Sequence, residues 1–149
     1  LRSGILPYAE LNDIGAAIHA RITRGLTMTA IEYAGHLRWL EHYRLVVFMT
    51  FEEVDFLVAP TVPVSPPLIA DADNAVTTTR LLSRNCWLAP AAGLPAITIP
   101  CGLDDNGVPI GFQLVGRRWS DVKLMAFAES IQRRLDDIGT PPEYLQTDT

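Results

Sequence analysis

The sequence predicts an α/β fold, because segments with helical and with strand-like patterns alternate along its 149 residues. One long segment, 29–53, contains no proline and carries apolar residues at helical spacing. Two strand-like segments, 96–100 and 110–115, flank the run 104–107, whose Asp-Asp-Asn-Gly sequence is typical of a hairpin turn. No internal repeat or long linker divides the chain, so we expect residues 1–149 to form one domain.

Two helices are expected in the N-terminal third. The first covers about 12–24, and Gly25 is expected to end it in a left-handed conformation. Its apolar stripe is Leu11, Ile14, Ile18 and Ile22. The second begins at Thr29, which forms the sequence pattern of a capping box with Glu32. The apolar residues of this segment form a stripe along one side of the expected helix, and only Arg44 interrupts it. A helix of this length spans roughly 35 Å, which is typical of helices that lie across a large sheet.

Segment 55–60 is the first predicted strand. Its four consecutive apolar residues cannot alternate between core and solvent, so we expect the strand to be covered on both faces, as in parallel sheets. Prolines then force an extended loop over 60–67. The polar segment 71–79 is expected to be mobile, and helix-compatible sequence follows over 81–92 with a break at Pro90.

A final helix is predicted after the hairpin. It begins at Ser120 or Asp121, which are good residues for a helix N-terminus, and it extends to about Ile138. Gly139 and two prolines then end it. Its apolar residues recur at spacings of four and three: Leu124, Ala128, Ile131, Leu135 and Ile138.

Composition excludes several classes of function. The net charge is −5 and no basic run occurs, so no direct nucleic-acid partner is expected. The stretch 85–103 has no charged residue, but Pro90, Pro95 and Pro100 argue against a membrane span, so no membrane partner is expected. Two cysteines and the lack of a signal peptide indicate reduced thiols and a cytoplasmic location. The chain begins at Leu1, as a fragment, a processed product or an incomplete record would.

No residue pattern in the chain assembles a catalytic site by itself. The histidines lack a metal-binding motif and no phosphate-binding glycine loop occurs, so neither a metal nor a cofactor is expected. Ser120 and Lys123 match a Ser-x-x-Lys pattern, but its companion motifs are absent and Ser120 is already explained as a helix cap. Cys101 is interpreted as a buried structural thiol. We therefore expect no catalytic residue here and no catalysis by this chain alone.

Three motifs in a fixed order carry a resemblance to a known family. The long helix runs into a strand that ends in Pro-Thr-Val-Pro at 60–63, segment 92–102 contains Gly-Leu-Pro-Ala, and segment 108–117 reads VPIGFQLVGR. Together they resemble the C-terminal part of the amidase signature family, over about residues 27–137. The resemblance implies an α/β fold with one mixed sheet flanked by helices. It also implies that residues 1–149 are a C-terminal fragment of an amidase domain, with no complete second domain.

The resemblance further implies an amide hydrolase whose catalytic residues lie upstream of this chain. Members of the family use a Ser nucleophile, a second Ser in a cis peptide and a Lys base, on a Gly/Ser-rich segment. This sequence has no such segment, and its only lysine, Lys123, falls in the final helix. The partners implied are the N-terminal remainder of the amidase and a small-molecule amide substrate. A homodimer is left open.

One segment is the candidate for substrate binding. The Arg-Asn-Cys sequence before Trp87 is similar to an Arg-Asn-Thr segment that approaches the acyl pocket in the family, which makes Asn85, Cys86 and Trp87 substrate-binding candidates. The chain departs from the family at Leu88 and Pro90, where many relatives have Pro and Asn. The alternative is that Asn85 and Trp87 only support packing, since buried polar groups mostly satisfy their neighbours.

Three functions remain open from the sequence. The first is the C-terminal part of an amidase that hydrolyses a carboxamide through an acyl-enzyme. The second is an A-subunit-like piece of a glutamyl-tRNA amidotransferase, which a glutamine-binding pocket would favour. The third is a non-catalytic, stand-alone domain of the same fold, which cooperative unfolding of the monodisperse 149-residue chain would favour. A fragment should instead aggregate through its unpaired sheet edge.

Overall fold

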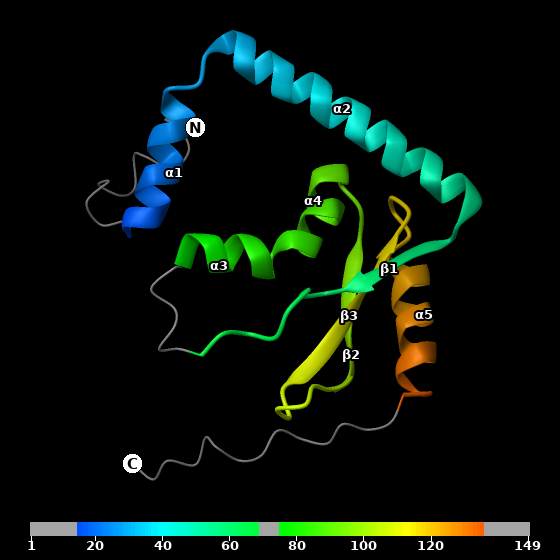
Figure 1. The fold of residues 1–149 in the computed structure, drawn as a ribbon. Coiled ribbons are helices and arrows are strands. Elements are labelled where there is room, and N and C mark those ends of the chain that lie inside the picture. The colour runs from blue at the N-terminus through cyan, green and yellow to red at the C-terminus, as the bar shows by residue number, and fades with distance from the viewer. Residues whose placement is uncertain (1–14, 69–74, 136–149) are drawn as a thin grey trace. The chain divides into compact units, whose positions relative to one another are not determined.

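The computed structural model describes residues 15–68 and 75–135. Two compact units divide the chain, Leu1–His42 and Tyr43–Thr149. The expectation that residues 1–149 belong to a single amidase domain stays a prediction. In chain order (Figure 1), the elements are α1 (Ala16–Leu26), α2 (Ala30–Glu53), β1 (Phe56–Pro60), α3 (Ala75–Leu82), the 3₁₀ helix η3 (Arg84–Trp87), α4 (Leu88–Ala92), β2 (Ala96–Leu103), β3 (Pro109–Gly116) and α5 (Asp121–Gln132).

The first unit holds α1 and the first half of α2. Gly25 lies inside α1, which ends at Leu26, so the expected left-handed stop at Gly25 is wrong. The expected start of this helix at residue 12 lies outside the described residues. The start of α2 is confirmed: the Glu32 N–H donates to Thr29 Oγ1 over 3.2 Å, and the Thr29 N–H donates to the Glu32 carboxylate over 2.8 Å. This reciprocal pair satisfies two amides that the helix itself leaves unpaired.

The second unit is built on a three-stranded antiparallel sheet in the order β1-β3-β2. The predicted hairpin between β2 and β3 is confirmed. In its turn, Asp104 Oδ1 accepts the N–H groups of Asn106 and Val108, both over 2.9 Å, and Gly107 has φ +77°. The expectation that β1 is covered on both faces is wrong, because β1 is an antiparallel edge strand and Val58 is 63% exposed. The α/β class itself is confirmed.

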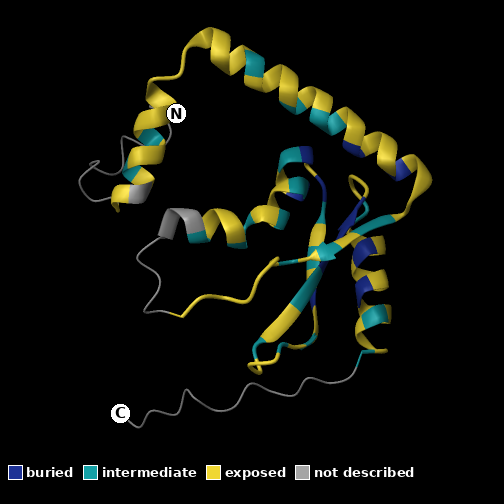
Figure 2. Cartoon of the chain, in the orientation of Figure 1, coloured by how far each residue is buried: buried dark blue, intermediate teal, exposed yellow. Residues whose placement is uncertain are grey.

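The central strand β3 separates two hydrophobic clusters. Leu114 and Val115 are adjacent on β3, so their side chains point to opposite faces of the sheet. One cluster joins the end of α2 to α4 and β3, and contains Val47, Phe51, Ala89, Ala92, Leu94 and Val115. The other joins α5 to the sheet, and contains Ile99, Leu114, Leu124 and Ala128. In Figure 2 the buried positions lie on these elements, so the core of the second unit surrounds β3.

The helical segment before β2 differs from the expectation. Residues 75–79 belong to α3, while 71–74 lie outside the described residues. The expected mobility of 71–79 stays a prediction. The helical run breaks at Ser83, between α3 and η3, and not at Pro90. Pro90 lies in the first turn of α4, where a missing N–H costs no helical hydrogen bond.

Two contacts hold the end of α4. The Arg44 Nε donates to the Ala91 carbonyl oxygen over 2.9 Å, which explains why an arginine interrupts the apolar stripe of α2. Gly93 follows α4 with φ +69°, a left-handed conformation that favours glycine, and the Leu94 N–H then donates to the Ala89 carbonyl oxygen over 2.9 Å. Both contacts satisfy carbonyl groups that the helix end leaves without an intrahelical partner.

The last helix, α5, starts where it was predicted and ends earlier. Ser120 precedes it, but its hydroxyl donates to the Arg117 carbonyl oxygen over 2.7 Å, so the expected side-chain cap by Ser120 is wrong. The helix ends at Gln132, and the expected end at Ile138 lies outside the described residues. No helix within 15–68 and 75–135 is both long and apolar enough to cross a membrane.

Candidate functional site

The predicted substrate-binding residues lie on η3, and two of them face the sheet. The Asn85 side chain donates from Nδ2 to the Pro60 carbonyl oxygen over 2.8 Å. The Cys86 Sγ lies 3.4 Å from the Thr61 carbonyl oxygen, its hydrogen-bond acceptor. Both contacts reach the end of β1, which is more than twenty residues away in the sequence. The polar groups of Asn85 and Cys86 therefore fasten η3 to the sheet.

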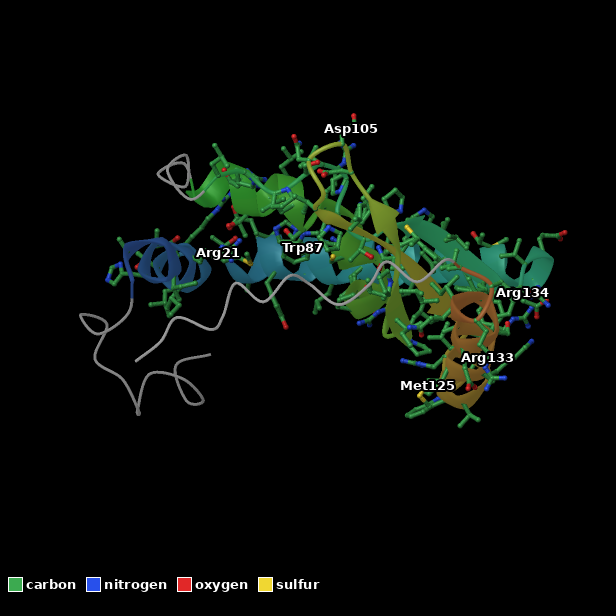
Figure 3. All side chains as sticks on the ribbon, turned by 90° about the horizontal axis from the view of Figure 1, so that it is seen from below. Arg21, Trp87, Asp105, Met125, Arg133 and Arg134 are labelled. Atoms are coloured by element: carbon green, nitrogen blue, oxygen red, sulfur yellow. The ribbon has the colours of Figure 1, made fainter. Side chains whose placement is uncertain are left out.

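Trp87 is the third predicted residue, and its ring faces solvent. It is 59% exposed, and Figure 3 labels its position. The indole Nε1 donates to Ser83 Oγ over 3.2 Å, and the Ser83 hydroxyl donates to the Thr79 carbonyl oxygen over 2.6 Å. These bonds restrain the indole while leaving its apolar surface available. Trp87 therefore presents a large exposed apolar side chain to a ligand, and the smaller Cys86 is exposed as well.

Sequence reasoning missed Gln113, the residue that ties η3 to the central strand. Its side chain is 5% exposed, and Nε2 donates to the Asn85 carbonyl oxygen over 2.8 Å. A single amide within the otherwise apolar strand 110–115 was the available signal. Gln113, Asn85 and Pro60 thus form one continuous hydrogen-bonded set across β3, η3 and β1.

A mainly apolar groove lies beside this set, with a volume of about 510 Å³. The Ser65 hydroxyl donates to Asp104 Oδ2 over 2.6 Å at its rim. This bond, together with the N–H groups of Val108 and Asn106, lowers the pKa of Asp104. Among the described residues, the groove is lined by Pro60, Val62, Pro63, Val64, Ser65, Pro66, Leu82, Asp104, Val108, Pro109, Ile110 and Gly111. Its walls suit the apolar part of a small molecule.

The other sequence patterns do not assemble a catalytic centre in the part of the chain that is described. The Lys123 Nζ donates to Asp55 Oδ1 over 2.8 Å, and the Ser120 hydroxyl faces Arg117, so the Ser-x-x-Lys pattern does not form a nucleophile and base. Within 15–68 and 75–135, no three His, Cys, Asp or Glu side chains are grouped to hold a metal ion. Cys101 is exposed, so its interpretation as a buried thiol is wrong, because it lies at a bulge of the edge strand β2.

Sequence comparison finds an amidotransferase subunit and a deaminase among the proteins that are similar to the chain. The A subunit of glutamyl-tRNA(Gln) amidotransferase from Neisseria meningitidis is 36% identical over 134 residues, which cover 87% of this chain and 28% of that protein. The 2-amino-5-chloromuconic acid deaminase of Comamonas testosteroni is 30% identical over 126 residues, covering 83% of this chain and 27% of that protein. The chain thus spans less than a third of the length of these relatives.

Solved structures show the same fold. A 6-aminohexanoate cyclic dimer hydrolase superposes with a TM-score of 0.74 at 22% identity, over 91% of this chain and 31% of the hydrolase. The A subunit of glutamyl-tRNA(Gln) amidotransferase from Thermotoga maritima superposes with a TM-score of 0.60 at 26% identity, over 86% of this chain and 30% of that chain. The family described as Amidase matches residues 8–125. The chain therefore belongs to the amidase family, and the resemblance found in the sequence is confirmed.

Proposed function

We propose that this chain is the C-terminal part of an amidase that hydrolyses a carboxamide through a seryl acyl-enzyme. The observation that carries the proposal is the family match over 8–125 in a chain that spans less than a third of its relatives. In the proposed reaction, a serine oxygen attacks the amide carbon and the C–N bond breaks as the amine takes up a proton. Water then hydrolyses the acyl ester and restores the serine. The nucleophile, second serine and lysine base lie upstream of this chain.

Exposed apolar side chains support the presence of a larger assembly around the second unit. On α2, Leu45, Val46 and Met49 are each at least 50% exposed, and on α5 Val122 and Met125 are 77% and 55% exposed. The same two helices bury Val47, Phe51 and Leu124, so each helix has a core-facing side and exposed apolar residues beside it. Large apolar surfaces are typical of faces that another part of a protein covers. We propose that the N-terminal remainder of the amidase covers them.

We propose that η3 forms part of the wall of the acyl pocket. In this proposal Trp87 contacts the apolar part of the substrate, while Asn85 and Cys86 hold the segment on β1 and do not themselves recognise the amide. The exposure of the Trp87 ring and the engagement of the Asn85 side chain with Pro60 support this division. The alternative that these residues only support packing therefore suits Asn85 better than Trp87.

Two proteins test the proposed reaction: the 149-residue chain, and the longer product of its natural coding sequence. Ammonia release is measured with butyramide, benzamide and glutamine. We expect multiple turnovers by the longer protein and none by the 149-residue chain. Turnover by the 149-residue chain that disappears when one of its own serines is replaced by alanine would contradict the proposal. Cooperative unfolding of a monodisperse, inactive 149-residue protein with no longer product would favour the non-catalytic, stand-alone domain.

A second candidate is the A-type component of an amidotransferase, which the 36% identity to the Neisseria meningitidis protein favours. The two candidates differ in substrate and partners. An amidotransferase component should release ammonia from glutamine preferentially, and more rapidly when its partner proteins are present. An independent amidase should hydrolyse butyramide or benzamide without any partner.

We also propose a cytoplasmic location, which the two free cysteines support. From the sequence we expect no direct contact with nucleic acid or membrane. A homodimer stays a prediction, which sedimentation of the longer protein tests. Fractionation of cells that produce the longer protein tests the location.

A further inference from the structure

Gln113 is unusual in its setting. It is the one buried polar side chain among the residues that the structure describes, and it lies in the central strand between Ala59 of β1 and Thr98 of β2. Its neighbours Leu114 and Val115 are buried and apolar. A buried amide without a partner would be costly, so the hydrogen bond from Gln113 Nε2 to the Asn85 carbonyl oxygen accounts for its presence.

This bond restrains the backbone of η3, and two further bonds restrain its side chains. The Asn85 amide donates to the Pro60 carbonyl oxygen, and the Cys86 thiol lies against the Thr61 carbonyl oxygen. The Thr61 N–H in turn donates to the Gly111 carbonyl oxygen over 2.9 Å, which fixes the end of β1 on β3. Consecutive residues of η3 are thus attached to both strands, immediately before Trp87. An apolar side chain at 113 would fill the same space without giving η3 a fixed direction, because hydrophobic contact is non-directional.

We propose that Gln113 is a positioning residue: its buried amide fixes the η3 backbone and thereby holds Trp87 in the orientation that lines the substrate pocket. The identity of the ligand, an amide, rests on the proposed function. The positioning of Trp87 does not, because it is measured in the longer protein without substrate. Gln113 contacts no ligand in this proposal, and acts only through Asn85.

The first test follows the Trp87 indole by NMR. Residues 1–149 contain three tryptophans, so Trp39→Phe with Trp119→Phe, and ¹⁵N labelling confined to this segment of the longer protein, leave a single indole N–H signal. In this background we expect Gln113→Met to shift or broaden the signal, because the η3 backbone loses its bond to β3. Ser83→Ala, which removes the acceptor of the indole N–H, gives the reference for a displaced ring.

Leu114→Val is the matched control for a general loss of stability. It removes buried volume from the adjacent position, but in the cluster under α5, on the other face of the sheet. We expect it to leave the Trp87 signal in place. An unchanged signal in Gln113→Met, or an equal shift in Leu114→Val, would overturn the positioning role.

Gln113→Glu gives a second test that does not depend on how well the methionine variant folds. A protonated carboxyl group can donate to the Asn85 carbonyl oxygen, and an ionised one cannot. Burial at this position raises the pKa of the introduced carboxyl group. We therefore expect the Trp87 signal to be displaced at alkaline pH, where the group ionises, and to return to its parental position as the pH is lowered. The same titration of the parental chain supplies the control. A signal in Gln113→Glu that follows the parental chain at every pH would overturn the proposal.

Kinetics of the longer protein test the link to the pocket. With benzamide as the probe, we expect Gln113→Met to raise KM while kcat stays close to that of the parent, because the ligand wall is displaced and the reacting groups are not. An unchanged KM would overturn the pocket role. If the longer protein hydrolyses no amide, the proposed function fails, and the pocket role fails with it. The Trp87 signal would still decide whether Gln113 positions the indole.

Discussion

The two faces of the three-stranded sheet are packed by different chemistry. Under α5 the contacts are apolar, with the rings of Phe56 and Phe127 stacked at a centroid distance of 4.4 Å. The ion pair on that side, Lys123–Asp55, is at the surface, and both side chains are more than 60% exposed. The face that carries η3 and α4 combines an apolar cluster with the buried amide of Gln113.

The two faces therefore have different roles. The apolar contacts under α5 stabilise the fold, whereas the hydrogen bonds under η3 also fix the orientation of that segment. Apolar burial stabilises the sheet in proportion to area and tolerates small movements. Buried hydrogen bonds are directional, and a lost partner leaves a costly unsatisfied group. The candidate site lies on the face with the directional contacts. We therefore expect substitutions under α5 to change stability alone, and substitutions under η3 to change the geometry of the site as well.

The largest effect is expected from Leu114→Ala. Leu114 is fully buried, so the substitution should lower the free energy of unfolding by about 2–5 kcal/mol through lost burial and a cavity. Urea unfolding measures the loss. Where the variant is still folded, the fluorescence of Trp87 in the single-tryptophan background should match the parent. A displaced Trp87 in the folded variant would show that the two faces are not independent.

A smaller loss of stability is expected from Gln113→Met. The side-chain volume is similar, but the Asn85 carbonyl oxygen loses its buried donor, which should cost about 1–3 kcal/mol. The same urea series measures it. In contrast to Leu114→Ala, this variant should change the Trp87 fluorescence at urea concentrations where it is fully folded. A stability loss with no spectral change would assign Gln113 a purely structural role.

Phe127→Leu should have a modest effect on the α5 face. It removes a stacked aromatic pair at a half-exposed position, worth about 0.5–1.5 kcal/mol beyond area burial. Met125→Leu is a matched control, since Met125 is exposed on the same helix (Figure 3) and its substitution should leave the unfolding midpoint nearly unchanged. Equal losses in the two variants would mean that the ring stack contributes nothing specific.

The smallest effect is expected from Lys123→Met. The hydrogen bond and charge of Lys123 lower the pKa of Asp55 in the folded chain, so their contribution is present above the unfolded pKa of an Asp and is lost as the pH falls through the folded pKa. Because both groups are exposed, the difference from the parent should be near the detection limit at neutral pH. Urea unfolding at neutral and at acidic pH tests the sign: the small difference should vanish in acid. A difference that grows in acid would contradict it.

Local features were predictable from the sequence, and contacts between distant segments were not. The Thr29–Glu32 capping box and the Asp104 turn were predicted because their partners lie within four residues. The pairing of β1 was not, because four apolar residues in a row are compatible with an antiparallel edge strand as well as with a buried parallel strand. Asn85 and Trp87 were identified by resemblance, whereas the bond from Gln113 spans 28 residues, and no local pattern encodes it.

The most direct test of the account is to locate the nucleophile. A fluorophosphonate probe phosphonylates an activated serine, forming an O–P bond as fluoride leaves, and mass spectrometry of the labelled longer protein identifies the modified residue. The account predicts a single labelled serine outside residues 1–149, and no labelling of the 149-residue chain alone. A label on a serine within residues 1–149, in either protein, would contradict it.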